Sequence, residues 1–132
     1  MKAVVLDATA VLALLQEESG AERVVAALPD AAISAVNLSE VVGKLTDSGM
    51  PEPAIRAALG ALGLDVHPFD EDQAYQAGLL RPATSRQGLS LADRACLALG
   101  HRLDRPVLTA DQAWASVRTG VEVRVIREPP RR

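Results

Sequence analysis

Aromatic residues are nearly absent from this chain, which has one Phe, one Trp and one Tyr among 132 residues. Proteins that bind single-stranded nucleic acid by base stacking present several exposed aromatic rings. The composition therefore argues against RNA binding of the RRM or OB-fold kind. It also means that the hydrophobic core must be built from Leu, Val, Ile and Ala.

Cysteine and long apolar runs are scarce as well. Cys96 is the single cysteine, so no intramolecular disulfide can form, and its apolar surroundings predict a buried side chain. No apolar run approaches the roughly 20 residues that a membrane-spanning helix needs, and no signal-peptide pattern precedes the first apolar run. We therefore expect a cytoplasmic protein with no membrane partner.

The charge balance is mild, with 14 basic and 17 acidic residues and a formal net charge of −3. This value is too small to identify a partner and weighs slightly against nonspecific nucleic-acid binding. The content of 48% hydrophobic and 23% charged residues is typical of a globular protein. The length predicts one domain over residues 1–127, followed by a short frayed tail at 128–132.

Short apolar runs alternate with helical patterns along the whole chain. The expected strands cover residues 2–6, 31–36, 64–69, 106–109 and 121–126, the last as an edge strand. The expected helices cover residues 8–17, 21–28, 37–48, 53–62, 70–80, 90–101 and 112–117, with a polar loop at 83–88. Strands separated by helices predict an α/β protein with a mostly parallel central sheet and helices on both faces.

Three acidic residues are expected at one edge of that sheet. Asp7 directly follows the first strand, Glu40 lies at the start of the helix after the second, and Asp111 follows the strand at 106–109. The carboxyl ends of parallel strands share an edge, where open α/β sheets bind their ligands. Asp93, in the first turn of the helix at 90–101, joins them if the amino end of that helix faces the same edge.

Helix capping is the alternative interpretation of each acid taken alone. Asn37 with Glu40, and Ser90 with Asp93, have the spacing of capping boxes. Asp7 and Asp111 precede helices and can cap them. Four clustered carboxylates, however, would repel one another strongly unless a cation compensated them.

A cluster of carboxylate oxygens favours Mg²⁺ or Mn²⁺ over zinc, which prefers His and Cys. His67 and His101 show no paired spacing that would add metal ligands. Mg²⁺ held by carboxylates typically meets a phosphate group, so phosphodiester hydrolysis is the expected reaction class. Thr9 has a hydroxyl that can orient a carboxylate or a water beside Asp7.

Four stretches of this chain resemble the signature blocks of PIN-domain ribonucleases. They are Asp7-Ala8-Thr9, Asn37-Leu38-Ser39-Glu40-Val41-Val42, Ser90-Leu91-Ala92-Asp93 and Leu108-Thr109-Ala110-Asp111-Gln112-Ala113-Trp114. The length and the Ala-Leu-Gly end of the Asp93 helix are most similar to VapC-type toxins of toxin–antitoxin pairs. The resemblance covers residues 2–126.

That resemblance implies a three-layer α/β/α sandwich and a Mg²⁺- or Mn²⁺-dependent endoribonuclease toxin. It also implies a homodimer and a cognate antitoxin protein as inhibitor. The residues Asp7, Glu40, Asp93 and Asp111 match the catalytic, metal-binding acids of the family, and Thr9 matches its accessory hydroxyl position. Arg94 is a departure, because many relatives carry a small residue there.

An acidic protein that cleaves RNA needs local positive charge to bind the substrate backbone. Lys44, Arg86 and Arg94 are the candidates, with Arg86 on a polar loop preferred. Apolar helix residues are expected either in the core or in an antitoxin groove or dimer contact. These residues are Val11, Leu12, Leu15, Val41, Val42 and Leu45.

The alternatives to a nuclease are a non-catalytic binding module and other proteins that place an acid after the first strand. A non-catalytic PIN-like module would use the same pocket to bind RNA or protein without cutting. A phosphoacceptor receiver or a haloacid-dehalogenase-like phosphatase also places an acid after its first strand. The dehalogenase pattern needs a second Asp where this chain has Thr9, and a receiver needs paired acids before its first helix, so both are disfavoured.

Overall fold

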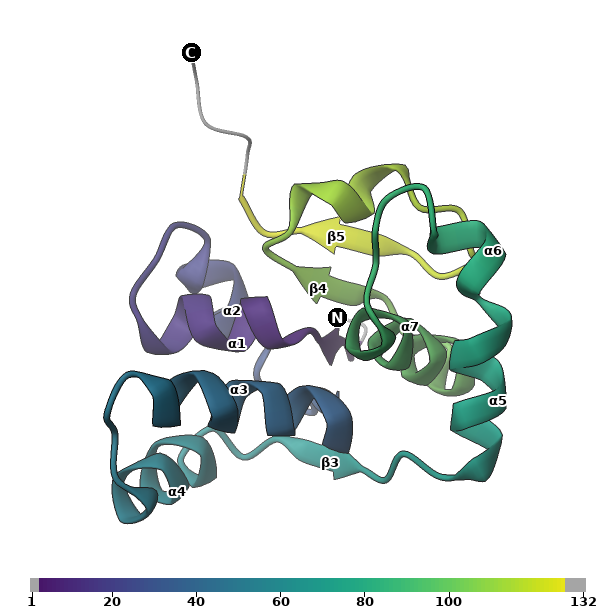
Figure 1. The fold of residues 1–132 in the computed structure, drawn as a ribbon. Helices are drawn as coiled ribbons and strands as arrows, with labels where there is room; N and C mark the ends of the chain where they lie inside the picture. The colour runs from purple at the N-terminus through teal and green to yellow at the C-terminus, as the bar shows by residue number, and fades with distance from the viewer. Residues whose placement is uncertain (1–2, 128–132) are drawn as a thin grey trace.

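The computed structural model describes residues 3–127 and contains one five-stranded parallel sheet (Figure 1). The strands are β1 (Val5–Leu6), β2 (Ala32–Ser34), β3 (Asp65–His67), β4 (Val107–Thr109) and β5 (Val123–Val125). Their order across the sheet is β3-β2-β1-β4-β5, so β5 is an edge strand, as the sequence predicts. The predicted parallel sheet is confirmed.

Helices cover both faces of this sheet and complete the predicted α/β/α sandwich. The helices are α1 (Ala8–Leu15), α2 (Ala21–Ala27), α3 (Ala35–Asp47), α4 (Glu52–Gly60), α5 (Glu71–Leu79), α6 (Arg81–Thr84), α7 (Leu91–Leu103) and the 3₁₀ helix η1 (Gln112–Ser116). Side chains of α1 to α4 pack in one core cluster with Val4 and Leu6. Side chains of α7 and η1 pack in a second cluster with Val5. Because successive residues of a strand face opposite ways, consecutive apolar residues around β1 serve both layers.

The central position of β1 decides where a ligand site can form. β1 pairs with β2 on one side and with β4 on the other, and Val5 lies opposite both Ala32 and Val107. The chain adds β2 and β3 on one side of β1 and then returns to add β4 and β5 on the other. The strand order therefore reverses between β1 and β4, and ligands of open α/β sheets bind at the carboxyl edge of such a switch point.

Two of the differences from the predicted helices have a local physical cause. Helix α3 begins at Ala35 rather than Asn37, because the Ser34 hydroxyl caps it by accepting from the Val36 N–H at 3.2 Å. Asn37 consequently lies inside the helix. Residues Arg81–Thr84 form α6 where we expected a break followed by the loop, since Pro82 suits the first turn of a helix.

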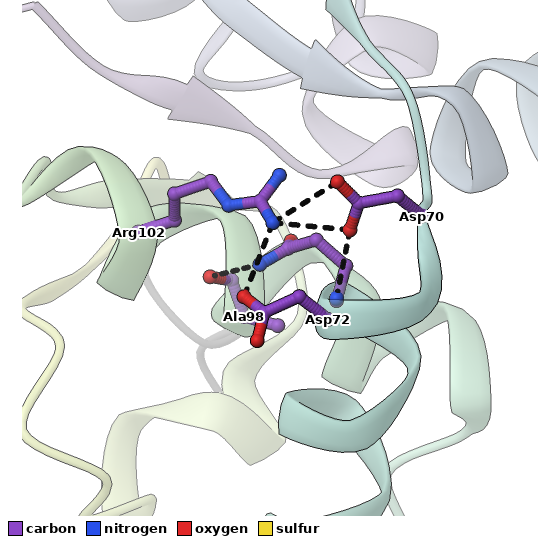
Figure 2. Close-up of polar contacts among 5 residues, drawn as sticks. Asp70, Asp72, Ala98 and Arg102 are labelled. Atoms are coloured by element: carbon purple, nitrogen blue, oxygen red, sulfur yellow. Dashed lines mark hydrogen bonds and ion pairs between the residues drawn. The ribbon is translucent and has the colours of Figure 1, made fainter.

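Helix α5 lies along α7 and is joined to it by polar contacts (Figure 2). The Arg102 guanidinium donates to Asp70 at 3.0 Å and to Asp72 at 3.2 Å. The buried Gln73 amide donates to the carbonyl of Ala98 at 3.3 Å. These contacts fix α7, whose first turn carries Asp93, against its neighbour.

The predicted tail at 128–132 lies outside the described residues. Within residues 3–127, no helix has the length and apolarity required to cross a membrane.

Candidate active site

Asp7 is a buried carboxylate at the carboxyl end of β1, with a side chain that is 1% exposed. It occupies the position before α1, but its side chain makes no capping hydrogen bond, so the capping interpretation of Asp7 is wrong. Its Oδ2 accepts from the Thr9 hydroxyl at 2.6 Å and from the Thr109 hydroxyl at 2.8 Å. Asp7 is thus bonded to the neighbouring strand β4 as well as to its own helix.

Both threonine hydroxyls are oriented by backbone N–H groups. The Thr9 Oγ1 accepts from the Ala110 N–H at 2.9 Å, and the Thr109 Oγ1 accepts from the Asp111 N–H at 3.1 Å. A hydroxyl that accepts from a backbone amide has its own proton free to donate, here to Asp7. Thr109 was not among the predicted site residues. The parallel pairing of Leu6 with Leu108 provides a signal for it, because the next residues along the two strands are Asp7 and Thr109.

Glu40 and Asp93 approach the same edge from α3 and α7. The Glu40 Oε1 accepts from the Asn37 amide at 3.1 Å, and that same amide donates to the Ala92 carbonyl at 2.9 Å. Asn37 and Glu40 therefore bond through their side chains, and the capping box predicted for them is wrong. The second capping box is confirmed, since the Asp93 Oδ2 accepts from the Ser90 N–H at 2.9 Å and the Ser90 hydroxyl accepts from the Asp93 N–H at 3.1 Å.

Asp111 follows β4 and is exposed. Its Oδ1 caps η1 by accepting from the Ala113 N–H at 2.9 Å, which confirms the capping interpretation for this acid.

The four acids Asp7, Glu40, Asp93 and Asp111 share one pattern of hydrogen bonding. Each uses one carboxylate oxygen as a hydrogen-bond acceptor, while the other accepts no hydrogen bond from any residue in 3–127.

Burial and the charges of neighbouring acids raise the pKa of two of these acids, Asp7 and Glu40. Burial, with smaller contributions from the charges of Asp93 and Glu40, raises the pKa of Asp7 from 3.8 to about 6, although the hydroxyls of Thr9 and Thr109 oppose the change. Burial also raises the pKa of Glu40, to which the charge of Asp93 adds, while the Asn37 amide and Lys44 oppose it. Asp7, Glu40 and Asp93 therefore lie close enough to influence one another.

The donor chemistry at this edge fits a hard divalent cation. All candidate donors are carboxylate oxygens, and each acid has an oxygen that is not engaged within residues 3–127. Nevertheless, no three His, Cys, Asp or Glu side chains in the described range are arranged closely enough to hold a metal ion as they lie. A bound ion would have to draw the carboxylates together. The four metal ligands and the choice of Mg²⁺ or Mn²⁺ stay predictions.

The three basic candidates lie in different environments. Lys44 is exposed one turn beyond Glu40 and lowers the pKa of that acid. Arg86 is exposed on the turn after α6. Arg94 is half-buried, and its guanidinium donates to the Ala77 carbonyl of α5 at 3.0 Å. Substrate binding by these residues stays a prediction, and for Arg94 it competes with this contact to α5.

Comparison with known proteins was made by sequence and by structure. The family model described as the PIN domain matches residues 4–119. No curated protein matches the chain.

Several solved structures share the fold. A toxin–antitoxin complex from Klebsiella pneumoniae aligns with a TM-score of 0.75 and 19% identity, covering 96% of this chain and 100% of that one. A DNA-bound VapBC from Salmonella typhimurium has a TM-score of 0.71 and 19% identity, covering 94% and 98% of the two chains. A Mycobacterium tuberculosis VapC described as a sarcin–ricin loop cleaving toxin has a TM-score of 0.67 and 16% identity, with coverages of 87% and 96%.

Proposed function

This chain belongs to the PIN-domain family, and we propose that it is a Mg²⁺- or Mn²⁺-dependent endoribonuclease that acts as the toxin of a toxin–antitoxin pair. The observation that carries the proposal is the set of three mutually repelling acids at the switch point between β1 and β4. Asp7 in particular is buried at the cost of a raised pKa and has one oxygen without a hydrogen bond from residues 3–127. A structural role alone does not explain such an arrangement.

Asp7, Glu40, Asp93 and Asp111 are the residues that would hold the ion. Thr9 and Thr109 fix Oδ2 of Asp7, so that its Oδ1 is presented in a defined orientation. The Asn37 amide and the Ser90 N–H fix one oxygen each of Glu40 and Asp93 in the same way. When bound, a divalent ion at such a site supplies activation of the attacking water and compensation of charge on the phosphodiester.

RNA is the proposed substrate, and its backbone would be positioned by local basic side chains. Lys44 on α3 and Arg86 on the turn before α7 are both exposed. Charge–phosphate contacts of this kind fix the register of a strand without reading its sequence. The preference for a particular RNA would therefore come from other contacts.

An antitoxin protein is the proposed inhibitor. The structural neighbours include a toxin–antitoxin complex and a DNA-bound VapBC. A groove of about 620 Å³ runs between α3 and α4 and is suited to the apolar face of an antitoxin helix. Its lining residues are Leu38, Val42, Thr46, Met50, Glu52, Ile55, Arg56 and Leu59. The homodimer stays a prediction.

The decisive experiment measures cleavage of a fluorogenic RNA during a Mn²⁺ titration. We expect metal-dependent cleavage by the wild type and no detectable cleavage by Asp7→Asn or Asp93→Asn, with circular dichroism showing that both variants remain folded. EDTA should abolish the wild-type activity. Undiminished cleavage by both variants would refute the proposal.

Asp104→Asn is the matched control for these substitutions. Asp104 ends α7 at the opposite end from Asp93 and has a φ of 52°, a conformation that Asn adopts readily. This variant should cleave like the wild type. If the wild type binds RNA and Mn²⁺ but never cuts, the non-catalytic PIN-like module is the correct function instead.

A further inference from the structure

Asn37 is a fully buried amide that joins α3 to α7 beside the acids. Its Nδ2 donates to the Glu40 carboxylate at 3.1 Å and to the Ala92 carbonyl at 2.9 Å. Ala92 directly precedes Asp93 in the first turn of α7. A single amide group therefore links the backbone next to one acid with the side chain of another.

The carbonyl end of the same amide has no hydrogen-bond partner in the described part of the chain. The Oδ1 of Asn37 is buried and accepts no hydrogen bond from residues 3–127. A buried polar atom without a partner is unfavourable, and such atoms in a native fold call for an explanation. Because both contacts of Nδ2 are to acceptors, the orientation of the amide is fixed by its donations. Packing alone would favour an apolar residue of similar size, so the two donated hydrogen bonds are the feature that needs a polar residue here.

We propose that Asn37 is a positioning residue that holds the Glu40 carboxylate against the first turn of α7, and thereby keeps Glu40 beside Asp93, where a cation can draw the two acids together. This inference rests on the proposed metal-dependent function. Glu40 has a long, rotatable side chain and is half-buried. Fixing Oε1 restricts the carboxylate and leaves Oε2 available as a ligand. Groups that orient metal ligands in this way typically change metal affinity 10- to 100-fold when they are removed.

Gln73 offers a matched comparison within the same protein. It is also a buried amide, 1% exposed, and it also donates to a carbonyl of α7, that of Ala98 (Figure 2). Ala98 lies six residues beyond Ala92, about 9 Å along the helix axis. The surroundings of Gln73 are the surface ion pairs of Arg102 with Asp70 and Asp72. Gln73 thus shares the structural contact of Asn37 without its link to an acid of the site.

The test compares Asn37→Leu with Gln73→Leu in the full-length, EDTA-treated protein. Mn²⁺ binding is measured by electron paramagnetic resonance titration, and stability by thermal unfolding without metal. We expect both variants to lose stability. We expect Asn37→Leu to bind Mn²⁺ at least about 10-fold more weakly than the wild type, and Gln73→Leu to stay within about 2-fold.

Cleavage of the fluorogenic RNA gives a second readout that general structural damage would not reproduce. Asn37→Leu should need a higher Mn²⁺ concentration for half-maximal activity, while its kcat at saturating Mn²⁺ recovers to near the wild-type value. Unchanged Mn²⁺ affinity in Asn37→Leu, with an active wild type, would overturn the inference and leave the proposed function standing. A wild type that neither binds Mn²⁺ nor cleaves RNA would overturn both.

A measurement on the wild type covers the case in which Asn37→Leu does not fold. The side-chain NH₂ resonances of Asn37 and Gln73 are followed by NMR during a Mg²⁺ titration. The inference requires the Asn37 signals to shift at the concentrations that saturate the site, while those of Gln73 stay in place. Unperturbed Asn37 signals at saturation would overturn it.

Discussion

Asp7 is the residue at which folding and the proposed function make opposite demands. Burial disfavours its charged form, and the hydroxyls of Thr9 and Thr109 offset that effect only in part, because the pKa still rises to about 6. In the folded protein without metal, Asp7 therefore binds a proton more tightly than it does in the unfolded chain. Its contribution to stability is fully present below the unfolded pKa and is lost as the pH rises through the folded value.

We predict a pH-dependent stability that belongs to this one residue. A pKa raised from 3.8 to about 6 makes the contribution of Asp7 to stability about 2.5 kcal/mol less favourable at pH 8 than at pH 4. Asp7→Asn has no proton to lose, so in EDTA at pH 7.5 it should be more stable than the wild type. Denaturant unfolding of both proteins at several pH values measures the difference. If Asp7→Asn were less stable than the wild type at pH 7.5, the raised pKa of Asp7 would not explain the pH dependence of stability.

At the scale of helices and strands, local signals were predictable and contacts distant in sequence were not. The capping box of Ser90 and Asp93 depends on residues three apart, so its spacing alone predicted the start of α7. The start of α3 was misplaced because both Ser34 and Asn37 are capping residue types. Which of the two caps the helix depends on the contact of the buried Asn37 with Ala92, a residue 55 positions away in the sequence.

The bond from Thr109 to Asp7 joins residues 102 positions apart. It follows from strand pairing, which the spacing of motifs does not specify. The meeting of Asp7 and Glu40 at one edge was predictable from the parallel sheet. The approach of Asp93 was predicted only on the condition that the amino end of its helix faces that edge, and the side-chain arrangement needed to hold an ion was not predictable.

Replacing two helical glycines by alanine should change the stability of the protein in opposite directions. A Cβ at Gly43 of α3 would meet nothing within 4 Å, so this position has room for a methyl group. Gly43→Ala should stabilise the protein by about 1 kcal/mol through helix propensity. A Cβ at Gly100 of α7 would lie 2.7 Å from Val107, so Gly100→Ala should destabilise it despite the same propensity gain. Thermal unfolding of the two variants measures both changes in stability. Equal changes would refute the argument that a Cβ at Gly100 clashes with its neighbours.

For the whole molecule, the alternation of strands and helices was sufficient to predict the architecture. The family resemblance drawn from four short blocks is confirmed by the PIN-domain match over residues 4–119. Of the apolar residues considered for the core or a partner surface, Val11, Val41 and Leu45 are buried in the core, while Val42 is 36% exposed and lines the groove between α3 and α4. That groove is the surface we propose for the antitoxin.

Val42→Asp should weaken binding of the proposed antitoxin without unfolding the toxin. A charge placed in an apolar interface costs about 2 kcal/mol or more, which corresponds to a Kd raised roughly 30-fold. Val25→Asp is the control, since Val25 is 52% exposed on α2 and does not line the groove. Calorimetric titration with the proposed antitoxin measures both affinities. Equal affinities for the two variants would place the interface elsewhere.

Asp93 caps a helix in addition to its proposed catalytic role, and this has a consequence for copies of the gene in other genomes. Asp93 starts α7 through its bond with the Ser90 N–H, so a copy that had abandoned catalysis would still gain from keeping it. Asp7 makes no capping bond and carries the penalty of a buried charge, so its loss should cost such a copy less than the loss of Asp93. In a copy of the gene that no longer needs activity, substitutions should therefore remove Asp7 before Asp93. An intact Asp7 is accordingly the better indication that a homologue has retained the proposed activity.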